Sequence, residues 1–223
     1  MKAEYLILNL LILAGPLALS FDRRVNFAQY WTKLFPAIII FLIPFIVWDI
    51  LVTGRHWWFN EQYTLDFRLL NLPLGEWLFF ITVPYACIFT WEVLVEYFSN
   101  REWSSLKFLN LIVFMLSIPA AGIMLIWGKE YTGIVLFVYG FVFFLDYLLK
   151  THIFRQRRTH IFSLLLTLMM LIFNGYLTAR PVVLYDAQYQ VDFRIYTIPI
   201  EDFFYGFALI YGILIVYEKL KRA

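Results

Sequence analysis

Seven apolar runs of membrane-spanning length constrain the fold of this chain more than any other feature. They cover residues 3–20, 31–50, 77–97, 105–127, 131–149, 161–178 and 199–218. A helix needs roughly 20 mostly apolar residues to cross the hydrocarbon core of a bilayer. The first run follows a single positive charge, Lys2, and lacks a clear cleavage signal, so we expect a retained helix and not a signal peptide. The sequence predicts an all-α integral membrane protein with about seven transmembrane helices.

A short pattern of charged residues and prolines occurs twice in the chain. The first copy has Asp-Phe-Arg at 66–68 and Pro-Leu-Gly-Glu at 73–76. The second copy has Asp-Phe-Arg at 192–194 and Pro-Ile-Glu-Asp at 199–202. The offset is constant at 126, since 192 − 66, 199 − 73 and 202 − 76 agree. Two matched sets of acids at the start of apolar runs suggest a two-fold site that handles protons or cations.

The repeat extends beyond these acids. Residues 51–55 resemble residues 176–180 at an offset of 125, and Glu92 matches Glu218 at 126. Helices 1–3 therefore pair with helices 5–7, and helix 4 connects them. A single connecting helix restores the orientation, so we expect a parallel 3+1+3 repeat about an axis along the membrane normal. The expected divisions of the single transmembrane domain 1–223 are a first repeat at 1–100, a connecting helix at 101–129 and a second repeat at 130–223.

The segments before the acids are expected to be extended. Apolar and polar residues alternate at 65–69 and at 191–195. This period of two favours short strands outside the hydrocarbon. Pro73 and Pro199 are then expected to open the following helices as first-turn prolines.

The basic residues predict an orientation. One end of the expected helices holds 12 of the 18 Lys and Arg residues and the other holds 6. By the positive-inside rule, the richer end is cytoplasmic. We therefore expect a multi-pass protein of the cytoplasmic membrane with its N-terminus outside, its C-terminus inside and both acid motifs at the outer side.

Glu76, Glu201 and Asp202 are the first candidates for catalysis. Acids just after a proline also suit a helix start, where they interact with unpaired N–H groups, so a purely structural role is the competing interpretation. The duplication and the adjacency of Glu201 to Asp202 favour function. Two carboxyl groups that share one proton can divide the roles of acid and base, and Glu201 with Asp202, completed by Glu76, has the composition for this.

Other residues near the acids are candidates for supporting roles. Asp49 ends the second expected helix on the motif side. Aromatic rings that follow the acids could stabilise a developing cation. These rings belong to Phe79, Phe80, Phe203, Phe204 and Tyr205.

Several classes of function find no support in the sequence. The net charge of +2 is too small to indicate binding to nucleic acid. The single cysteine, Cys87, excludes an internal disulfide and a cysteine-rich metal site. No His, Asp or Glu pair has metal-ligand spacing, and no dinucleotide fingerprint or P-loop is present, so we expect neither a metal nor a cofactor.

The duplicated Pro-x-Glu-(Glu/Asp) element before an aromatic helix resembles the membrane-integral lycopene cyclase family, which occurs as two small subunits or one fused chain. Trp58-Phe59-Asn60 with Tyr63 also resembles the first repeat of that family. The likeness covers nearly the whole chain. It implies acid-catalysed, redox-neutral cyclisation of lycopene and related linear carotenoids within membrane lipid, giving β-ionone rings (γ-carotene, then β-carotene). It leaves open a homo-oligomer or an association with other carotenoid enzymes.

The resemblance also implies roles for single residues. Glu76, Glu201 and Asp202 become the acid and base candidates, framed by Pro73 and Pro199. The sequence departs from the family at Gly75, where a first Glu is usual, so the second motif is the expected proton donor. The repeated pairs flanking these motifs are expected to surround the site, namely Asp66, Arg68, Asp192 and Arg194.

Three other functions are compatible with a chain of seven membrane helices. A retinal-binding protein needs a lysine in the middle of its last helix, and residues 203–216 contain none. A proton-coupled transporter would also use repeats and membrane acids, but the prolines at 44, 84 and 119 have no counterparts in the second half. A cyclase that acts on C50 carotenoids stays open within the same family.

Overall fold

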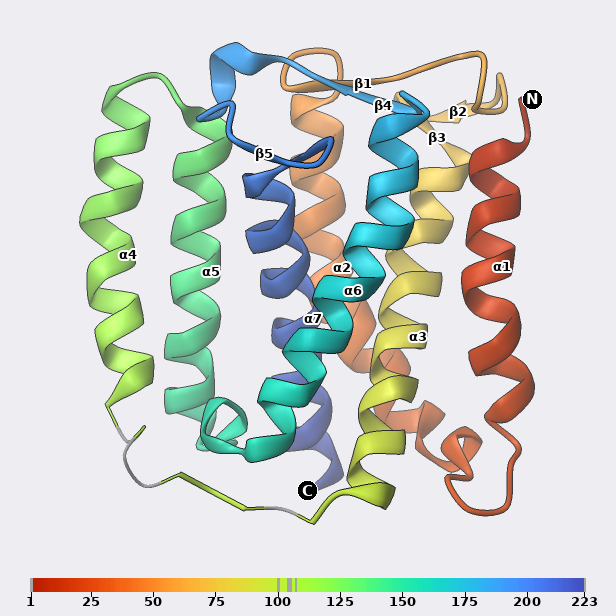
Figure 1. The fold of residues 1–223 in the computed structure, drawn as a ribbon, viewed down its shortest axis with the longest axis vertical. Coiled ribbons are helices and arrows are strands. Elements are labelled where there is room, and N and C mark those ends of the chain that lie inside the picture. Colours follow the sequence, from red (N-terminus) through yellow and green to blue (C-terminus); the bar gives the residue numbers. More distant parts are fainter. Residues whose placement is uncertain (1, 100, 104–105, 107, 223) are drawn as a thin grey trace.

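The computed structural model describes residues 2–99, 101–103, 106 and 108–222, and within these residues it is a bundle of seven α-helices (Figure 1). The α-helices are α1 (Glu4–Leu19), α2 (Trp31–Val52), α3 (Leu74–Tyr97), α4 (Leu109–Ile126), α5 (Glu130–Leu149), α6 (Arg157–Ala179) and α7 (Ile200–Lys221). The 3-10 helices are η1 (Phe27–Tyr30), η3 (Ile153–Arg155) and η4 (Ala187–Tyr189). Each of the seven apolar runs contributes one α-helix, so the predicted all-α class is confirmed.

Six of the helices in the described part of the chain are long and apolar enough to cross a bilayer, and α1 is the exception. It has 16 residues and therefore extends only about 24 Å at the usual rise per residue. The hydrocarbon core of a bilayer is about 30 Å thick. The first predicted span is therefore a helix that is shorter than the other six.

The extended segments before α3 and α7 form matching hairpins. β2 (Arg68–Leu69) pairs with β3 (Leu72–Pro73), and β5 (Arg194–Ile195) pairs with β6 (Ile198–Pro199). The first hairpin turns through Leu70 and Asn71, both with positive φ, which is the conformation of a tight two-residue hairpin loop. The prolines lie one position earlier than predicted, because Pro73 and Pro199 are the residues that precede the first helical turn.

A third pair of strands joins the two repeats. β1 (Trp57–Phe59) and β4 (Val183–Tyr185) are antiparallel, and the central pair of the register is Trp58 with Leu184. These two positions differ by 126, the repeat offset. An antiparallel ribbon whose central pair joins equivalent residues is two-fold symmetric, so this ribbon lies on the axis that relates the repeats.

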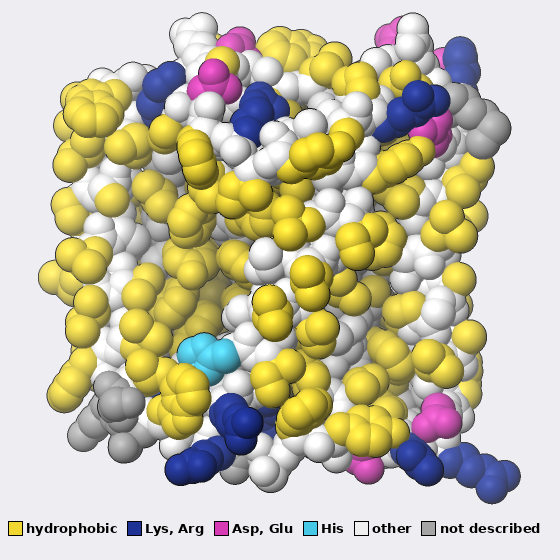
Figure 2. Space-filling view, in the orientation of Figure 1, with side chains coloured by type: hydrophobic (Ala, Val, Ile, Leu, Met, Phe, Trp, Pro, Cys, Tyr) yellow, Lys and Arg dark blue, Asp and Glu magenta, His cyan; other side chains and the backbone are white. Residues whose placement is uncertain are grey.

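The core of the bundle lies around α3 and α7. Within their most apolar windows, 61% of the α3 residues and 67% of the α7 residues are buried, against 17% in α4. The connecting helix α4 packs on α5 at the edge of the bundle (Figure 1). Figure 2 shows hydrophobic side chains across the middle of one face and charged side chains toward its two ends, as expected for a protein surrounded by lipid.

The chain termini lie at opposite ends of the bundle (Figure 1). The two hairpins, the β1–β4 ribbon and the N-terminus share one end, and the C-terminus lies at the other. Lys107, one of the 12 basic residues counted at the cytoplasmic end, lies outside the described residues.

Close packing of α2 against α7 yields a prediction about stability. A Cβ atom added at Gly212 would lie 2.1 Å from Cε1 of Phe41, whereas nothing lies within 4 Å of a Cβ at Gly122 on α4. Overpacking a core costs about 1–3 kcal/mol or more. We expect Gly212→Val to lower the unfolding temperature of the detergent-solubilised protein. The control Gly122→Val should leave it unchanged, and equal melting of both variants would contradict this packing.

Candidate active site

An apolar cavity of about 380 Å³ lies below the hairpins. Three carboxylic acids line it, from three helices and both repeats: Asp49 of α2, Glu76 of α3 and Asp202 of α7. All three side chains are buried, with relative exposures of 1%, 8% and 6%. Electrostatic interaction links Glu76 with both Asp49 and Asp202. The site therefore gathers acids that lie far apart in the sequence.

Glu76 is held by a tyrosine from the neighbouring helix. The hydroxyl of Tyr5 on α1 donates to Oε2 of Glu76 at 2.6 Å. The second repeat contains the same pair, since the hydroxyl of Tyr131 on α5 donates to Oδ1 of Asp202 at 2.6 Å. Both residues of the second pair are 126 positions after those of the first, so the tyrosine–carboxyl contact is part of the repeat.

Asp202 accepts two further hydrogen bonds. The Tyr185 hydroxyl donates to Oδ2 at 2.7 Å, and Nδ2 of Asn174 donates to the same oxygen at 2.9 Å. Burial raises the pKa of Tyr185 well above its ordinary value, so this residue, which lies in β4 outside the membrane helices, stays a neutral donor at physiological pH. With Tyr131, three neutral donors point at one carboxyl group.

Asp49 has a different environment. Its Oδ1 accepts from Nε1 of Trp57 at 2.7 Å and from Oγ1 of Thr53 at 3.1 Å. Its Oδ2 is buried and has no hydrogen-bond partner among the described residues. At the offset of 125, the equivalent position in the second repeat is Asn174, so one repeat has a carboxyl group where the other has an amide.

The structure does not bring Glu201 into the cavity. Its Oε1 instead accepts from Oγ1 of Thr132 at 2.5 Å and from the backbone N–H of Val191 at 2.8 Å. Successive residues of an α-helix point about 100° apart, so Asp202 faces the cavity while Glu201 faces Thr132 and Val191. The cavity therefore groups Asp202 with Glu76 and Asp49, and Glu201 interacts electrostatically with Asp202 from outside it.

Packing at α1 accounts for Gly75, the departure from the family pattern. A Cβ atom at this position would lie 2.6 Å from Cδ1 of Tyr5. The backbone carbonyl of Gly75 also accepts from Nδ2 of Asn9 at 3.0 Å. A side chain at this position would displace the tyrosine that holds Glu76.

The five aromatic candidates are separated by the fold. Phe79 and Tyr205 line the cavity. Phe80 and Phe203 are buried, and Phe204 packs edge-on against Tyr139 with ring centroids 5.1 Å apart. The rings that line the cavity beside the acids also include four that the sequence analysis did not propose, namely Tyr5, Trp57, Tyr131 and Tyr185. The 126-residue spacing of Tyr5 and Tyr131 is a signal that could have identified two of them.

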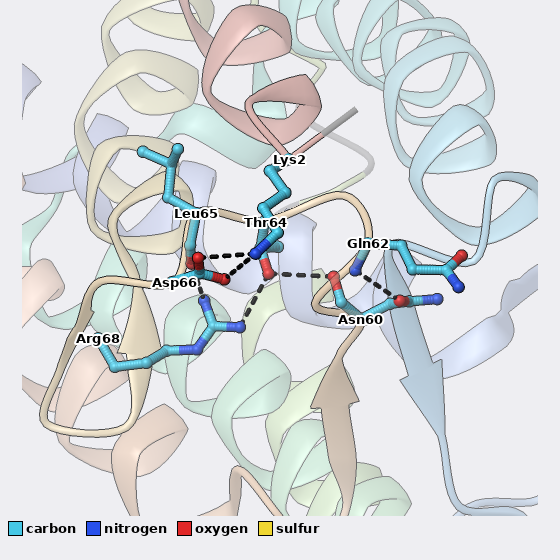
Figure 3. A network of polar contacts seen from close by, with 7 residues as sticks. All are labelled: Lys2, Asn60, Gln62, Thr64, Leu65, Asp66 and Arg68. Carbon is cyan, nitrogen blue, oxygen red and sulfur yellow. Dashed lines mark hydrogen bonds and ion pairs between the residues drawn. The ribbon is translucent and has the colours of Figure 1, made fainter.

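The Asp-Phe-Arg elements lie in the loops at the mouth of the bundle. Figure 3 shows Asp66 bound by Nζ of Lys2 at 2.7 Å, and Arg68 donating to the Leu65 carbonyl and the Thr64 hydroxyl at 2.8 Å each.

In the second repeat, Asp192 lies 3.7 Å from Nε of Arg194. The guanidinium of Arg194 lies 5.9 Å from the ring centroid of Tyr185. Arg194 thus contacts the site indirectly, through a tyrosine that binds Asp202. Among the described residues, no group of three or more His, Cys, Asp or Glu could hold a metal ion.

The comparisons with known proteins agree with this two-fold arrangement. A family model described as lycopene cyclase matches the chain twice, at residues 2–94 and 128–220. The two matched segments are offset by 126, since 128 − 2 and 220 − 94 agree, and together they span most of the chain. No curated protein and no solved structure matches it. The match over both repeats shows that the chain belongs to the lycopene cyclase family.

Proposed function

We propose that the chain is a lycopene β-cyclase, which closes the linear ψ end groups of lycopene into β-ionone rings, giving γ-carotene and then β-carotene. The observation that carries this proposal is the convergence of three carboxylic acids in one apolar, aromatic-lined cavity within a membrane bundle. Acid-catalysed cyclisation of a hydrocarbon needs a proton donor, a proton acceptor, stabilisation of a cation and exclusion of water.

The reaction conserves all atoms and electrons. A carboxylic acid protonates C2 of the end group, and the C1=C2 double bond becomes a tertiary cation at C1. The electrons of the C5=C6 double bond then form the C1–C6 bond and leave a cation at C5. Loss of the proton on C6 restores the C5=C6 double bond, so the product is an isomer of the substrate.

We assign Glu76 as the proton donor, in place of the second motif that the resemblance led us to expect. Its Oε2 accepts from Tyr5, and no described residue makes a hydrogen bond to Oε1. Asp49 interacts electrostatically with Glu76 and has one unpartnered oxygen of its own. Two carboxyl groups confined together in an apolar site can share one proton, which is the arrangement that a proton donor requires.

We assign Asp202 as the base that removes the C6 proton. Three donors, from Tyr131, Tyr185 and Asn174, point at its two oxygens. Hydrogen bonds to a carboxylate stabilise its ionised form. Asp49 in the first repeat and Asn174 in the second occupy equivalent positions. Glu76, the proposed acid, therefore has a second carboxyl group as its neighbour, whereas Asp202, the proposed base, has an amide that donates a hydrogen bond.

The aromatic rings of the cavity are suited to the cationic intermediates. Trp57 and Tyr131 have ring centroids 5.1 Å apart, and Tyr131 and Tyr185 are stacked at 6.4 Å. Ring faces attract cations more strongly where water is excluded. We propose that these rings, with Phe79 and Tyr205, stabilise the charge at C1 and C5.

We also propose that the protein lies in the cytoplasmic membrane with the hairpin end outside and the C-terminus in the cytoplasm. The excess of basic residues at the C-terminal end supports this orientation. The substrate is itself apolar, so it reaches the site from the bilayer.

The acid assignments are tested by substitution in a bacterial host that accumulates lycopene. We expect Glu76→Gln and Asp202→Asn each to lower the rate of cyclisation by about 10²-fold or more, the range of a general acid or base. Glu201→Gln is the matched control, because it is a neighbouring acid on α7 outside the cavity, and it should retain activity. Pigment analysis after confirmed membrane expression measures the result.

Two other outcomes of this experiment would contradict the proposal. Unchanged lycopene with well-expressed wild type would contradict the proposed function and favour proton-coupled transport or another carotenoid substrate. Loss of activity in Glu201→Gln, with activity kept in Asp202→Asn, would overturn the assignment of the base.

The mechanism also predicts isotope incorporation. In D₂O, the proton donor exchanges with solvent, and its deuteron is transferred to C2, where it stays as part of a CHD group. Each ring formed should therefore carry one deuterium, measured by mass spectrometry of the purified carotenoid. Rings formed without deuterium in fully exchanged membranes would contradict proton donation by a carboxyl group.

The role of Asn174 gives a separate prediction. Asn174→Leu removes one of three donors from Asp202, and a hydrogen bond to a charged group contributes about 1.5–3 kcal/mol. We expect the rate to fall by roughly 10- to 100-fold with the fold intact. Thr178→Val, one turn further along α6, is the control, because its hydroxyl bonds to α6 carbonyls and Thr197 and not to the acids.

A further inference from the structure

The cavity extends from the acids toward the lipid-facing surface between α1 and α6. Both helices pack on α3, whose residues Val83, Ala86 and Cys87 form the inner wall. Leu11 on α1 lines the cavity and is also 67% exposed, so the cavity reaches the outer surface of the bundle at this side chain. We call this opening the α1–α6 window, and its lining residues are Leu11, Gly15, Pro16, Met169, Met170 and Phe173.

Polar contacts close the outer end of the α1–α6 window. Glu4 on α1 accepts from Nε of Arg180 at 2.9 Å and from the hydroxyl of Tyr176, both at the end of α6. The guanidinium of Arg180 lies 4.8 Å from the ring centroid of Tyr63. The window is therefore bounded by charges toward the membrane surface and lined by apolar side chains below them.

The second repeat has the same closure between α5 and α2. Glu130 on α5 binds Arg55, which follows α2, and Arg55 lies 5.2 Å from the ring centroid of Tyr189. The offsets agree with the repeat, since 130 − 4 and 189 − 63 are both 126, and 180 − 55 is 125. The outer boundary of the window is thus duplicated.

Between α5 and α2, below the contact of Glu130 with Arg55, aromatic side chains of α2 occupy the space that corresponds to the window. The α2 residues Phe41, Phe45 and Trp48 occupy the positions equivalent to Leu166, Met170 and Phe173 of α6, at the offset of 125. Phe41 and Phe45 are buried, with exposures of 8% and 4%. The ring centroids of Phe45 and Trp48 lie 5.0 and 5.2 Å from that of Tyr205.

Resting on the proposed function, we propose that a linear carotenoid inserts one end group sideways from the bilayer through the α1–α6 window. The cavity volume of about 380 Å³ is at the lower end of the range for drug-sized ligands, so it holds one end of the hydrocarbon while the polyene stays in lipid. The aromatic side chains of α2 close the equivalent route. One chain therefore forms one ring in each binding event.

A side chain that obstructs the window tests the route. Nothing lies within 4 Å of a Cβ at Gly15, so a larger residue can be added there without displacing a neighbour. In liposomes that contain lycopene, we expect Gly15→Trp to lower the initial rate by about tenfold or more, and Gly15→Ala to lower it by less than about twofold. Gly122→Trp on α4 is the matched control, since its Cβ also meets nothing within 4 Å, and it should keep the wild-type rate.

A second variant obstructs the window from the opposite side. Met169→Trp on α6 should also lower the rate, and thermal unfolding in detergent checks that each variant is folded. If the wild type converts no lycopene, the proposed function fails. If the wild type is active and both folded tryptophan variants keep its rate, the entry route is overturned while the function stands.

The products formed early by the wild type test the claim of one ring in each binding event. With lycopene in excess, the first cyclised product in the membrane should be monocyclic. A bicyclic product that accumulates from the start without a monocyclic one would overturn this claim.

Discussion

The hydrogen bond between a buried tyrosine and a buried carboxyl group, made once in each repeat, is the contact on which the site depends. Tyr5 binds Glu76 and Tyr131 binds Asp202, each at 2.6 Å. These bonds join α1 to α3 and α5 to α7, and they provide partners for carboxyl groups that lie inside a membrane bundle. A polar group left without a partner in such surroundings costs several kcal/mol. The same bonds direct both carboxyl groups toward one cavity near the two-fold axis.

The proposed chemistry depends on the differences between the two repeats. Acid–base catalysis needs one group that gives a proton and another that takes one, so two identical acids would not suffice. The exchange of Asp49 for Asn174 gives Glu76 and Asp202 different neighbours, since Asp49 interacts electrostatically with Glu76 and Asn174 donates a hydrogen bond to Asp202. The exchange of Met170 for Phe45 leaves space on one side and fills the other. The family match at both halves shows the shared scaffold, and these exchanges are where the halves diverge.

Much of the fold could be predicted from the sequence, because a bilayer limits its solutions to a few. The apolar runs predicted the seven helices, and the 126-residue offset predicted the repeat. Alternation of apolar and polar residues predicted extended segments before α3 and α7, but not their pairing as hairpins. The length of α1 was overestimated, since hydropathy alone does not locate where a helix begins and ends. These features depend on local sequence and on spacing along the chain.

The site was less accessible to sequence reasoning, because it depends on contacts between distant segments. Glu76 and Asp202 lie in the cavity, but adjacency in sequence also suggested Glu201, whose carboxyl group instead bonds to Thr132 outside the cavity. The sequence indicated only a supporting role for Asp49, because no feature of the residues around it shows that it lines a cavity with acids from two other helices. The tyrosines carried no motif of their own, and only their register with the repeat connected them to the acids.

The most direct test of the central claim, that acids from both repeats act on one end group in one cavity, is an experimental structure in lipid nanodiscs. The Glu76→Gln variant would be loaded with lycopene so that the substrate is bound but not consumed. We expect an end group in contact with positions 49, 76 and 202, with the polyene leaving between α1 and α6. An end group seated between α5 and α2, or on the outer surface away from these acids, would contradict it.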